Sequence, residues 1–215
     1  MNIFLDFDGT LVDVAPRHYA VYAECILELY GQPLPADEYW QLKRDKEPWE
    51  VILPKSGVKI GYKQAFLNNF IFRIESPDFL KDDLLIPGAA DFLGLASAKH
   101  DLYLVSLRRK PENLKNQIAS LGIEHFFKQI LSGHSENDGS DVKAAIIGQI
   151  AQTDDVIIGD TEADILTAKQ LGLKGVAVTS GIRSKQFLAQ MEPYLLLESI
   201  ASPELRAFII DVHNK

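Results

Sequence analysis

Two aspartates, Asp6 and Asp8, directly follow a short apolar segment at residues 3–5. Side chains alternate along an extended segment, so residues two apart can face the same site. One carboxylate of such a pair can attack a phosphorus atom, and the other can transfer protons to and from the reacting groups. Gly9 beside them permits a tight turn and a close approach of the backbone to a phosphate. The spacing suggests phosphoryl-transfer chemistry, although Asp and Gly are also common in solvated turns.

Further polar side chains stand where other apolar segments end. Ser106 ends the segment 101–106, and Asp160 follows the letters VIIG. In a parallel α/β sheet, ligands bind beyond the carboxyl ends of the strands. Carboxylates that converge there would repel one another unless a cation lay among them, and oxygen ligands with a phosphate suit Mg²⁺. The sequence therefore predicts a Mg²⁺ site at this edge.

The elements that must position these residues alternate between strand and helix from about residue 86 onward. This alternation implies βαβ crossovers and a parallel sheet with helices on both faces. The expected fold is an α/β, doubly wound, Rossmann-like parallel sheet. Strands are predicted at 101–106, 128–133, 154–160 and 174–180, and helices at 88–100, 111–122, 140–152 and 161–172.

Residues 14–85 have a different pattern, with aromatic and aliphatic residues at helical spacing in 17–31 and 62–75 and several prolines between them. No convincing strand alternation occurs there. We expect an inserted helical cap domain at 14–85, between the two parts of the core domain at 1–13 and 86–215.

Composition restricts the classes of function. The chain has 215 residues, of which 47% are hydrophobic, and a net charge of -8, which disfavours nucleic acid and anionic membranes as partners. No stretch approaches the roughly 18 apolar residues that span a bilayer, and two early aspartates exclude a signal peptide. The one cysteine, Cys25, excludes an internal disulfide framework and fits a reducing compartment, so a cytoplasmic protein is expected.

Together these segments resemble the haloacid dehalogenase (HAD) superfamily. The letters DFDGTLVD match its first motif, Ser106 the second, Lys143 the third, and GDTEAD at 159–164 the fourth. The four matches occur in the family's order across nearly the whole chain. The helical insertion resembles the cap of members similar to phosphoglycolate phosphatase and β-phosphoglucomutase.

The resemblance implies a role for each matched residue. Asp6 would be the nucleophile and Asp8 the general acid/base. Asp6, the backbone carbonyl of Asp8 and Asp160 would hold Mg²⁺, and Asp164 would orient the metal shell. Mg²⁺ and a lysine offset the charge that phosphoryl transfer develops.

Substrate contacts are expected from Gly9, Ser106 and Lys143. The Ser106 hydroxyl can donate to a phosphoryl oxygen, although it could instead be an ordinary strand-end cap. Lys143 would lie in the first turn of a helix capped by Ser140 or Asp141. A cation at the start of a helix interacts unfavourably with the helix dipole. The position is explained if the ammonium faces a phosphate and Asp6. The alternative is a solvated surface lysine.

Some residues depart from the family pattern. Leu107 and Arg108 follow Ser106, where many relatives have Asn or Gly. Arg108 could bind an anionic oxygen pair or belong to a solvated loop. His18 matches a histidine at the cap entry of relatives that handle sugar phosphates, but a packed hinge histidine is as good a hypothesis. The basic run 43–49 is expected to be an exposed charged turn rather than a source of substrate contacts.

The favoured function is a Mg²⁺-dependent phosphatase that hydrolyses a small phosphorylated metabolite through an aspartyl-phosphate. Two alternatives stay open: a phosphomutase of the β-phosphoglucomutase type, and a non-enzymatic metabolite-binding protein derived from the family. The sequence specifies neither the substrate nor the oligomeric state.

Overall fold

The centre of the molecule is a parallel sheet of six strands in the order β5-β4-β1-β6-β7-β8. The computed structural model describes residues 1–134 and 139–211. β1 lies in the middle, with Leu5 level with Leu104 on one side and Ile158 on the other. The strands are β1 (Asn2–Leu5), β4 (Asp101–Ser106), β5 (Gln129–Ser132), β6 (Val156–Gly159), β7 (Lys174–Val178) and β8 (Leu195–Leu197).

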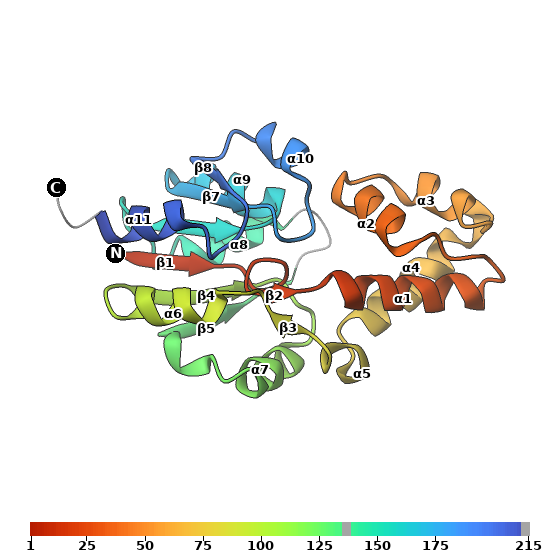
Figure 1. Cartoon of the computed structure of the whole chain (residues 1–215), viewed down its shortest axis with the longest axis horizontal. Coiled ribbons are helices and arrows are strands. Elements are labelled where there is room, and N and C mark those ends of the chain that lie inside the picture. The colour runs from red at the N-terminus through yellow and green to blue at the C-terminus, as the bar shows by residue number, and fades with distance from the viewer. Residues whose placement is uncertain (135–138, 212–215) are drawn as a thin grey trace.

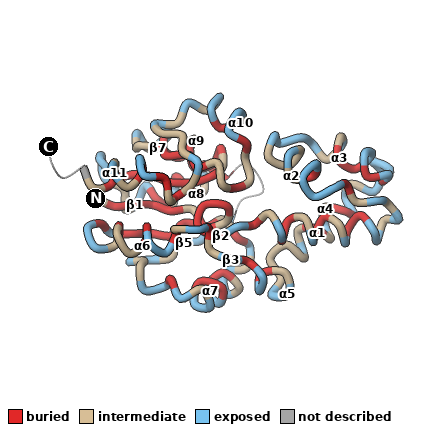
Figure 2. The backbone as a smooth tube through the Cα atoms, viewed as in Figure 1, coloured by how far each residue is buried: buried red, intermediate tan, exposed pale blue. Residues whose placement is uncertain are grey.

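Helices cover both faces of this sheet (Figure 1). Ile3 and Leu5 pack with residues of α6, α7 and α11, whereas Phe4 packs on the other face with residues of α8 and α9. The central strands are therefore buried on both sides, as parallel strands usually are (Figure 2). The helices are α6 (Ala89–Ser97), α7 (Pro111–Ser120), α8 (Ser140–Ile147), α9 (Glu162–Leu171), α10 (Lys185–Ala189) and α11 (Pro203–Asp211), with a 3₁₀ turn at Glu124–Phe126.

A helical cap stands beyond the carboxyl ends of the strands and has a hydrophobic core of its own (Figure 1). The ring of Tyr22 stacks on that of Tyr39 at 3.9 Å inside this core. Its helices are α1 (Ala15–Glu28), α2 (Ala36–Arg44), α3 (Trp49–Lys55), α4 (Lys63–Ile74) and α5 (Pro77–Leu80), with a 3₁₀ turn at Ile60–Tyr62.

Two short strands, β2 (Val12–Asp13) and β3 (Leu84–Leu85), pair antiparallel where the chain enters and leaves the cap. The domain bounds expected at 13 and 86 stay a prediction, and this pair lies next to both. Segment 14–85 was expected to contain no strand, which is wrong for β3. A strand of two residues is too short to show the alternation of apolar and polar residues by which a strand is predicted.

The α/β doubly wound sheet with an inserted helical cap is confirmed. Each of the four strands expected after residue 86 is present, shortened at its ends in three cases. None of the helices within residues 1–134 and 139–211 is both long and apolar enough to cross a bilayer.

Candidate active site

A cavity of about 540 Å³ opens between the carboxyl ends of the strands and the cap. The core contributes Asp6, Asp8, Ser106 and Lys143 to its lining. The cap contributes α1 and α4 side chains, among them Arg17, His18 and Phe70. The structure thus brings together residues that are distant in the chain, such as Asp6 and Lys143, which are 137 positions apart.

The Lys143 ammonium joins two carboxylates on the floor of this cavity. Its Nζ donates to Asp6 Oδ1 at 2.6 Å and to Asp164 Oδ1 at 2.5 Å. Burial acts to lower the pKa of Lys143, but Asp164 and Asp6 outweigh it, so the pKa lies above its usual value and the amine is charged. Lys143 is a buried ion-pair partner of Asp6 and not a solvated surface lysine.

The local fold around Lys143 differs in one detail from the expectation. α8 begins at Ser140, and Gly139 takes the N-cap position with a left-handed φ of 86°. Neither Ser140 nor Asp141 is therefore the cap, so that assignment was wrong. Lys143 still lies near the start of the helix.

Asp160 completes an acidic cluster with Asp6 and Asp164. One carboxylate oxygen of each lies within 4.8 Å of the others. Burial raises the pKa of Asp6 to about 7, although Lys143 opposes the shift, and burial together with Asp6 raises the pKa of Asp160 well above its usual value. Three carboxylates with one ammonium leave a deficit of positive charge, so this donor set fits a divalent cation.

Glycines make room for these carboxylates. A Cβ at Gly9, whose φ is +82°, would lie 2.3 Å from Asp160 Oδ2, and one at Gly181 would lie 2.0 Å from the same oxygen. The backbone N–H of Ile182 donates to Asp160 Oδ2 at 2.6 Å. The close approach of the loops after β1 and β7 therefore holds Asp160 in place.

Asp164 is fixed from its own helix as well as by Lys143. Thr161 is the N-cap of α9, and its backbone N–H and hydroxyl donate to Asp164 Oδ2 at 3.2 and 2.8 Å. A Cβ at Gly159 would lie 2.0 Å from Asp164 Cγ. The fourth motif thus orients Asp164 toward Lys143.

The Asp8 carboxylate is bound by two arginines. Arg108 donates through Nε to Oδ2 at 2.7 Å and through a terminal nitrogen to Oδ1 at 2.6 Å. Arg17 of the cap helix α1 donates to the same Oδ1. Burial acts to raise the pKa of Asp8, but Arg108 and Arg17 outweigh it and hold the pKa far below the usual value. Asp8 is therefore ionised, and its side chain is not part of the acidic cluster.

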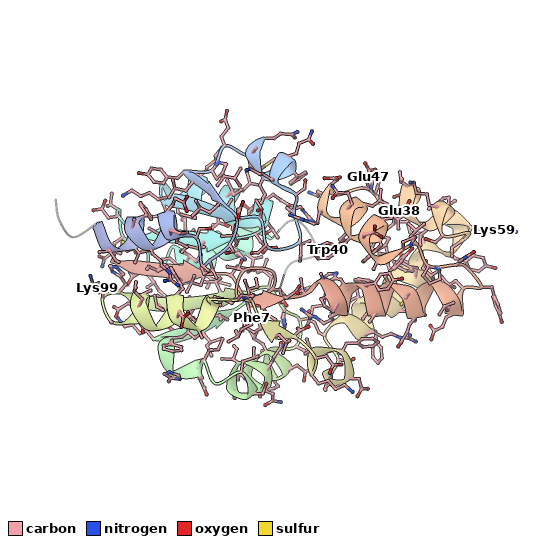
Figure 3. All side chains as sticks on the ribbon, viewed as in Figure 1. Phe7, Glu38, Trp40, Glu47, Lys59 and Lys99 are labelled. Carbon is pink, nitrogen blue, oxygen red and sulfur yellow. The ribbon has the colours of Figure 1, made fainter. Side chains whose placement is uncertain are left out.

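Arg108 is buried rather than part of a solvated loop. Its guanidinium lies 5.0 Å from the ring centroid of Phe7, which Figure 3 labels, and donates to Gln117 Oε1 at 2.6 Å. Ser106 is buried at the cavity wall, where its Oγ accepts from the Arg108 N–H at 3.3 Å. The expected substrate contacts of Gly9, Ser106 and Arg108 stay predictions.

Sequence reasoning missed several residues of the lining. Glu162 of α9 binds both Arg183, at 2.6 Å to Nε, and Lys46 of the basic run, at 2.8 Å to Nζ. The run 43–49 is therefore more than the exposed turn that was expected. Glu162 lies inside the fourth motif, between Asp160 and Asp164, which was the available signal. Nothing local marked Arg17 or Arg183.

His18 is buried between the rings of Trp40 and Phe70, each 5.9 Å away, and lines the cavity. Its Nδ1 has no hydrogen-bond partner within the described residues. Burial holds its pKa well below the usual value, so the ring is neutral. His18 is thus a packed histidine with one edge at the cavity.

Known protein sequences match most of the chain. The family model described as haloacid dehalogenase-like hydrolase matches residues 3–178. A phosphoglycolate phosphatase of Synechococcus elongatus is 26% identical over 201 residues, which cover 92% of each chain.

Solved structures share the fold. A haloacid dehalogenase-like hydrolase from Streptococcus pneumoniae superimposes with a TM-score of 0.76 at 23% identity, covering 96% of this chain and 97% of the other. A protein provisionally described as a beta-phosphoglucomutase, from Thermotoga maritima, superimposes with a TM-score of 0.68 at 17% identity. The match covers 98% of this chain and 99% of the other.

Proposed function

Because the chain belongs to the haloacid dehalogenase-like hydrolase family, we propose that it is a Mg²⁺-dependent phosphatase that hydrolyses a small phosphorylated metabolite. The observation that carries the proposal is the Asp6 carboxylate, which Lys143 holds at the floor of a cavity beside Asp160 and Asp164. The phosphoglycolate phosphatase relatives support a small phosphate monoester as the substrate class.

Asp6 is the nucleophile in this proposal. A carboxylate oxygen of Asp6 forms a bond to phosphorus while the ester bond to the leaving alcohol breaks, which gives an aspartyl-phosphate. Water then attacks this phosphorus, releases inorganic phosphate and restores the carboxylate. Lys143 orients Asp6 through its 2.6 Å hydrogen bond and offsets the developing charge, and the Ser106 hydroxyl donates to a phosphoryl oxygen.

Asp8 moves the protons. Its carboxylate is ionised, so it can accept a proton from the attacking water as it stands. To protonate the leaving oxygen, Asp8 must first take up a proton from solvent. That requires it to give up at least one contact to Arg17 or Arg108, because both hold it in the charged form.

Asp6 and Asp160 are the carboxylates that would hold Mg²⁺, with the Asp8 backbone carbonyl as a further ligand and Asp164 orienting the shell. The shortage of positive charge among these three carboxylates supports this assignment. A bound Mg²⁺ supplies positive charge that offsets the phosphoryl oxygens.

The test is release of phosphate from p-nitrophenyl phosphate with Mg²⁺ present and then chelated. Asp6→Asn should abolish turnover because an amide does not attack phosphorus, while the near-isosteric change leaves the fold intact by circular dichroism. Activity of Asp6→Asn within about tenfold of the unmodified enzyme, or activity indifferent to chelation, would contradict the proposal.

A further inference from the structure

Two arginines and two carboxylates lie together where the cap joins the core, in what we call the charge cluster: Asp8, Arg17, Asp83 and Arg108. The side chains of Arg17, Asp83 and Arg108 are at most 4% exposed. That of Asp8 is 21% exposed and lines the cavity. Buried ions are stable only while each keeps an opposite charge. Any movement of Asp8 must therefore leave the arginines another partner.

Asp83 is the member of the cluster that does not line the cavity. It directly precedes β3, where the chain leaves the cap. Its Oδ2 is 3.2 Å from Arg17 Nε and 4.0 Å from a terminal nitrogen of Arg108. Arg17 Nε nevertheless has no hydrogen-bond partner within residues 1–134 and 139–211. Asp83 is therefore near both arginines, while Asp8 receives their short hydrogen bonds.

Gln117 of α7 holds Asp83 and Arg108 side by side. Its Oε1 accepts from a terminal nitrogen of Arg108 at 2.6 Å, and its Nε2 donates to Asp83 Oδ2 at 2.8 Å. Arg17 Nε and Asp83 Oδ2 are already within hydrogen-bond distance, so a change in orientation alone would complete their bond. Asp83 is thus placed to receive an arginine that Asp8 releases.

The two tasks of Asp8 in the proposed function make different demands on this cluster. As a base toward water, Asp8 can act from its present position. As an acid toward the leaving oxygen, it must give up a contact to Arg17 or Arg108. Taking the partner from a buried guanidinium is costly, and that cost would add to the barrier of the step. A second carboxylate that receives the arginine offsets the cost.

We propose that Asp83 is a positioning residue that receives Arg17 and Arg108 when Asp8 turns toward the leaving group. This rests on the proposed function, which makes Asp8 the acid of the first step. Asp83 touches neither the substrate nor the metal and acts through the two arginines. Its contribution is therefore largest for substrates whose leaving oxygen most needs a proton, and small where the leaving group departs without one.

Two matched substrates test this role: phenyl phosphate and p-nitrophenyl phosphate, which differ by one nitro group. Phenolate is the stronger base, so its departure needs more help from an acid. Asp83→Asn should lower the ratio of kcat/KM for phenyl phosphate to kcat/KM for p-nitrophenyl phosphate by about 10- to 100-fold. Asp83→Glu keeps the charge and should restore most of the ratio. Both substrates are measured on one preparation, so a loss of folded enzyme cancels.

The matched control is Asp82→Asn, which removes the same charge from the adjacent, exposed position. It should leave the ratio of the two kcat/KM values unchanged. Equal losses for both substrates in Asp83→Asn would show that Asp83 only supports the fold and would overturn the proposal. An Asp83→Asn ratio equal to that of the control would overturn it as well.

A measurement without turnover separates failure of this inference from failure of the proposed function. The Nε–H group of Arg17 gives its own proton–nitrogen NMR signal, which Arg17→Lys assigns. In Asp8→Ala this signal should move downfield, because Nε–H then donates to the Asp83 carboxylate, and in Asp8→Ala/Asp83→Ala the shift should be lost. The shift in a protein without phosphatase activity would overturn the phosphatase and keep the exchange of partners. No shift, in an active phosphatase, would overturn the role of Asp83.

Discussion

Asp6 and Asp8 are separated by one residue, yet their carboxylates have opposite surroundings. Asp6 is half-buried beside Asp160 and Asp164, and desolvation raises its pKa to about 7. Asp8 is also half-buried, but two arginines hold its pKa far below the usual value. Near neutral pH, Asp6 needs a further cation to be fully ionised, whereas Asp8 does not.

Asp8→Asn should slow the two chemical steps unequally. An aryl phosphate has a leaving group that needs little protonation, so it still phosphorylates Asp6, while hydrolysis of the aspartyl-phosphate lacks its base. Stopped-flow kinetics should show a burst of p-nitrophenolate, and intact-mass analysis should find a phosphorylated protein. With an alkyl phosphate the expected loss is about 10²–10⁴-fold. Equal losses without burst or phosphoenzyme would leave Asp8 a purely structural role.

The same substitution should also destabilise the fold, because it leaves the buried Arg17 and Arg108 with Asp83 as their one remaining shared carboxylate among the described residues. Removing one partner of a buried pair costs about 3 kcal/mol or more, measurable by urea unfolding. Asp154→Asn, in an exposed turn, is the matched control and should change the free energy of unfolding little.

At the scale of elements, the site depends on loops that pass very close to β6. Gly181, in the loop after β7, leaves room for the Asp160 carboxylate, and Thr161 caps α9 together with Asp164. These elements hold the carboxylates of Asp160 and Asp164 in position. Small backbone shifts should therefore weaken Mg²⁺ binding as well as lower the free energy of unfolding.

Gly181→Ala should weaken activation by Mg²⁺ by about 10- to 100-fold, because the added Cβ would displace Asp160. The measurement is the Mg²⁺ concentration for half-maximal phosphatase activity. Gly61→Ala is the control, since its Cβ would meet nothing within 4 Å. An unchanged Mg²⁺ requirement in Gly181→Ala would contradict the assignment of Asp160 as a ligand.

At the scale of the whole molecule, the cap and the core share one cavity. Arg17 of the cap binds Asp8, and Arg44 at the end of α2 donates to the Thr179 carbonyl at 2.7 Å. The cap therefore contacts the core at two separate places. In the proposed mechanism, the position of the cap would decide which acceptor reaches the aspartyl-phosphate.

If that acceptor is water, turnover in water enriched in oxygen-18 should place one heavy oxygen in each released phosphate. Mass spectrometry of the phosphate measures this directly. A mutase would instead pass the phosphoryl group to a sugar hydroxyl. Conversion of a sugar monophosphate to its isomer much faster than phosphate release would replace the phosphatase with a phosphomutase.

The sequence by itself determined what depends on local pattern. Strands and helices each have a hydrophobic period that follows from backbone geometry. The polar residue Ser106 ends a strand, and Asp6 and Asp160 directly follow one. Parallel strands bring their carboxyl ends to one edge, so the floor of the site could be predicted without knowing the strand order.

Only the tertiary structure decided the rest. Asp8 meets Arg108 from 100 positions away, and Lys46 meets Glu162 from another element. Such pairs depend on how separate elements pack and on the side-chain rotamers that this packing allows. The hydrophobic periodicity of one segment carries no information about either. For the same reason, the run 43–49 was expected to be a solvated turn. The charge balance of the cavity is a property of elements brought together by packing.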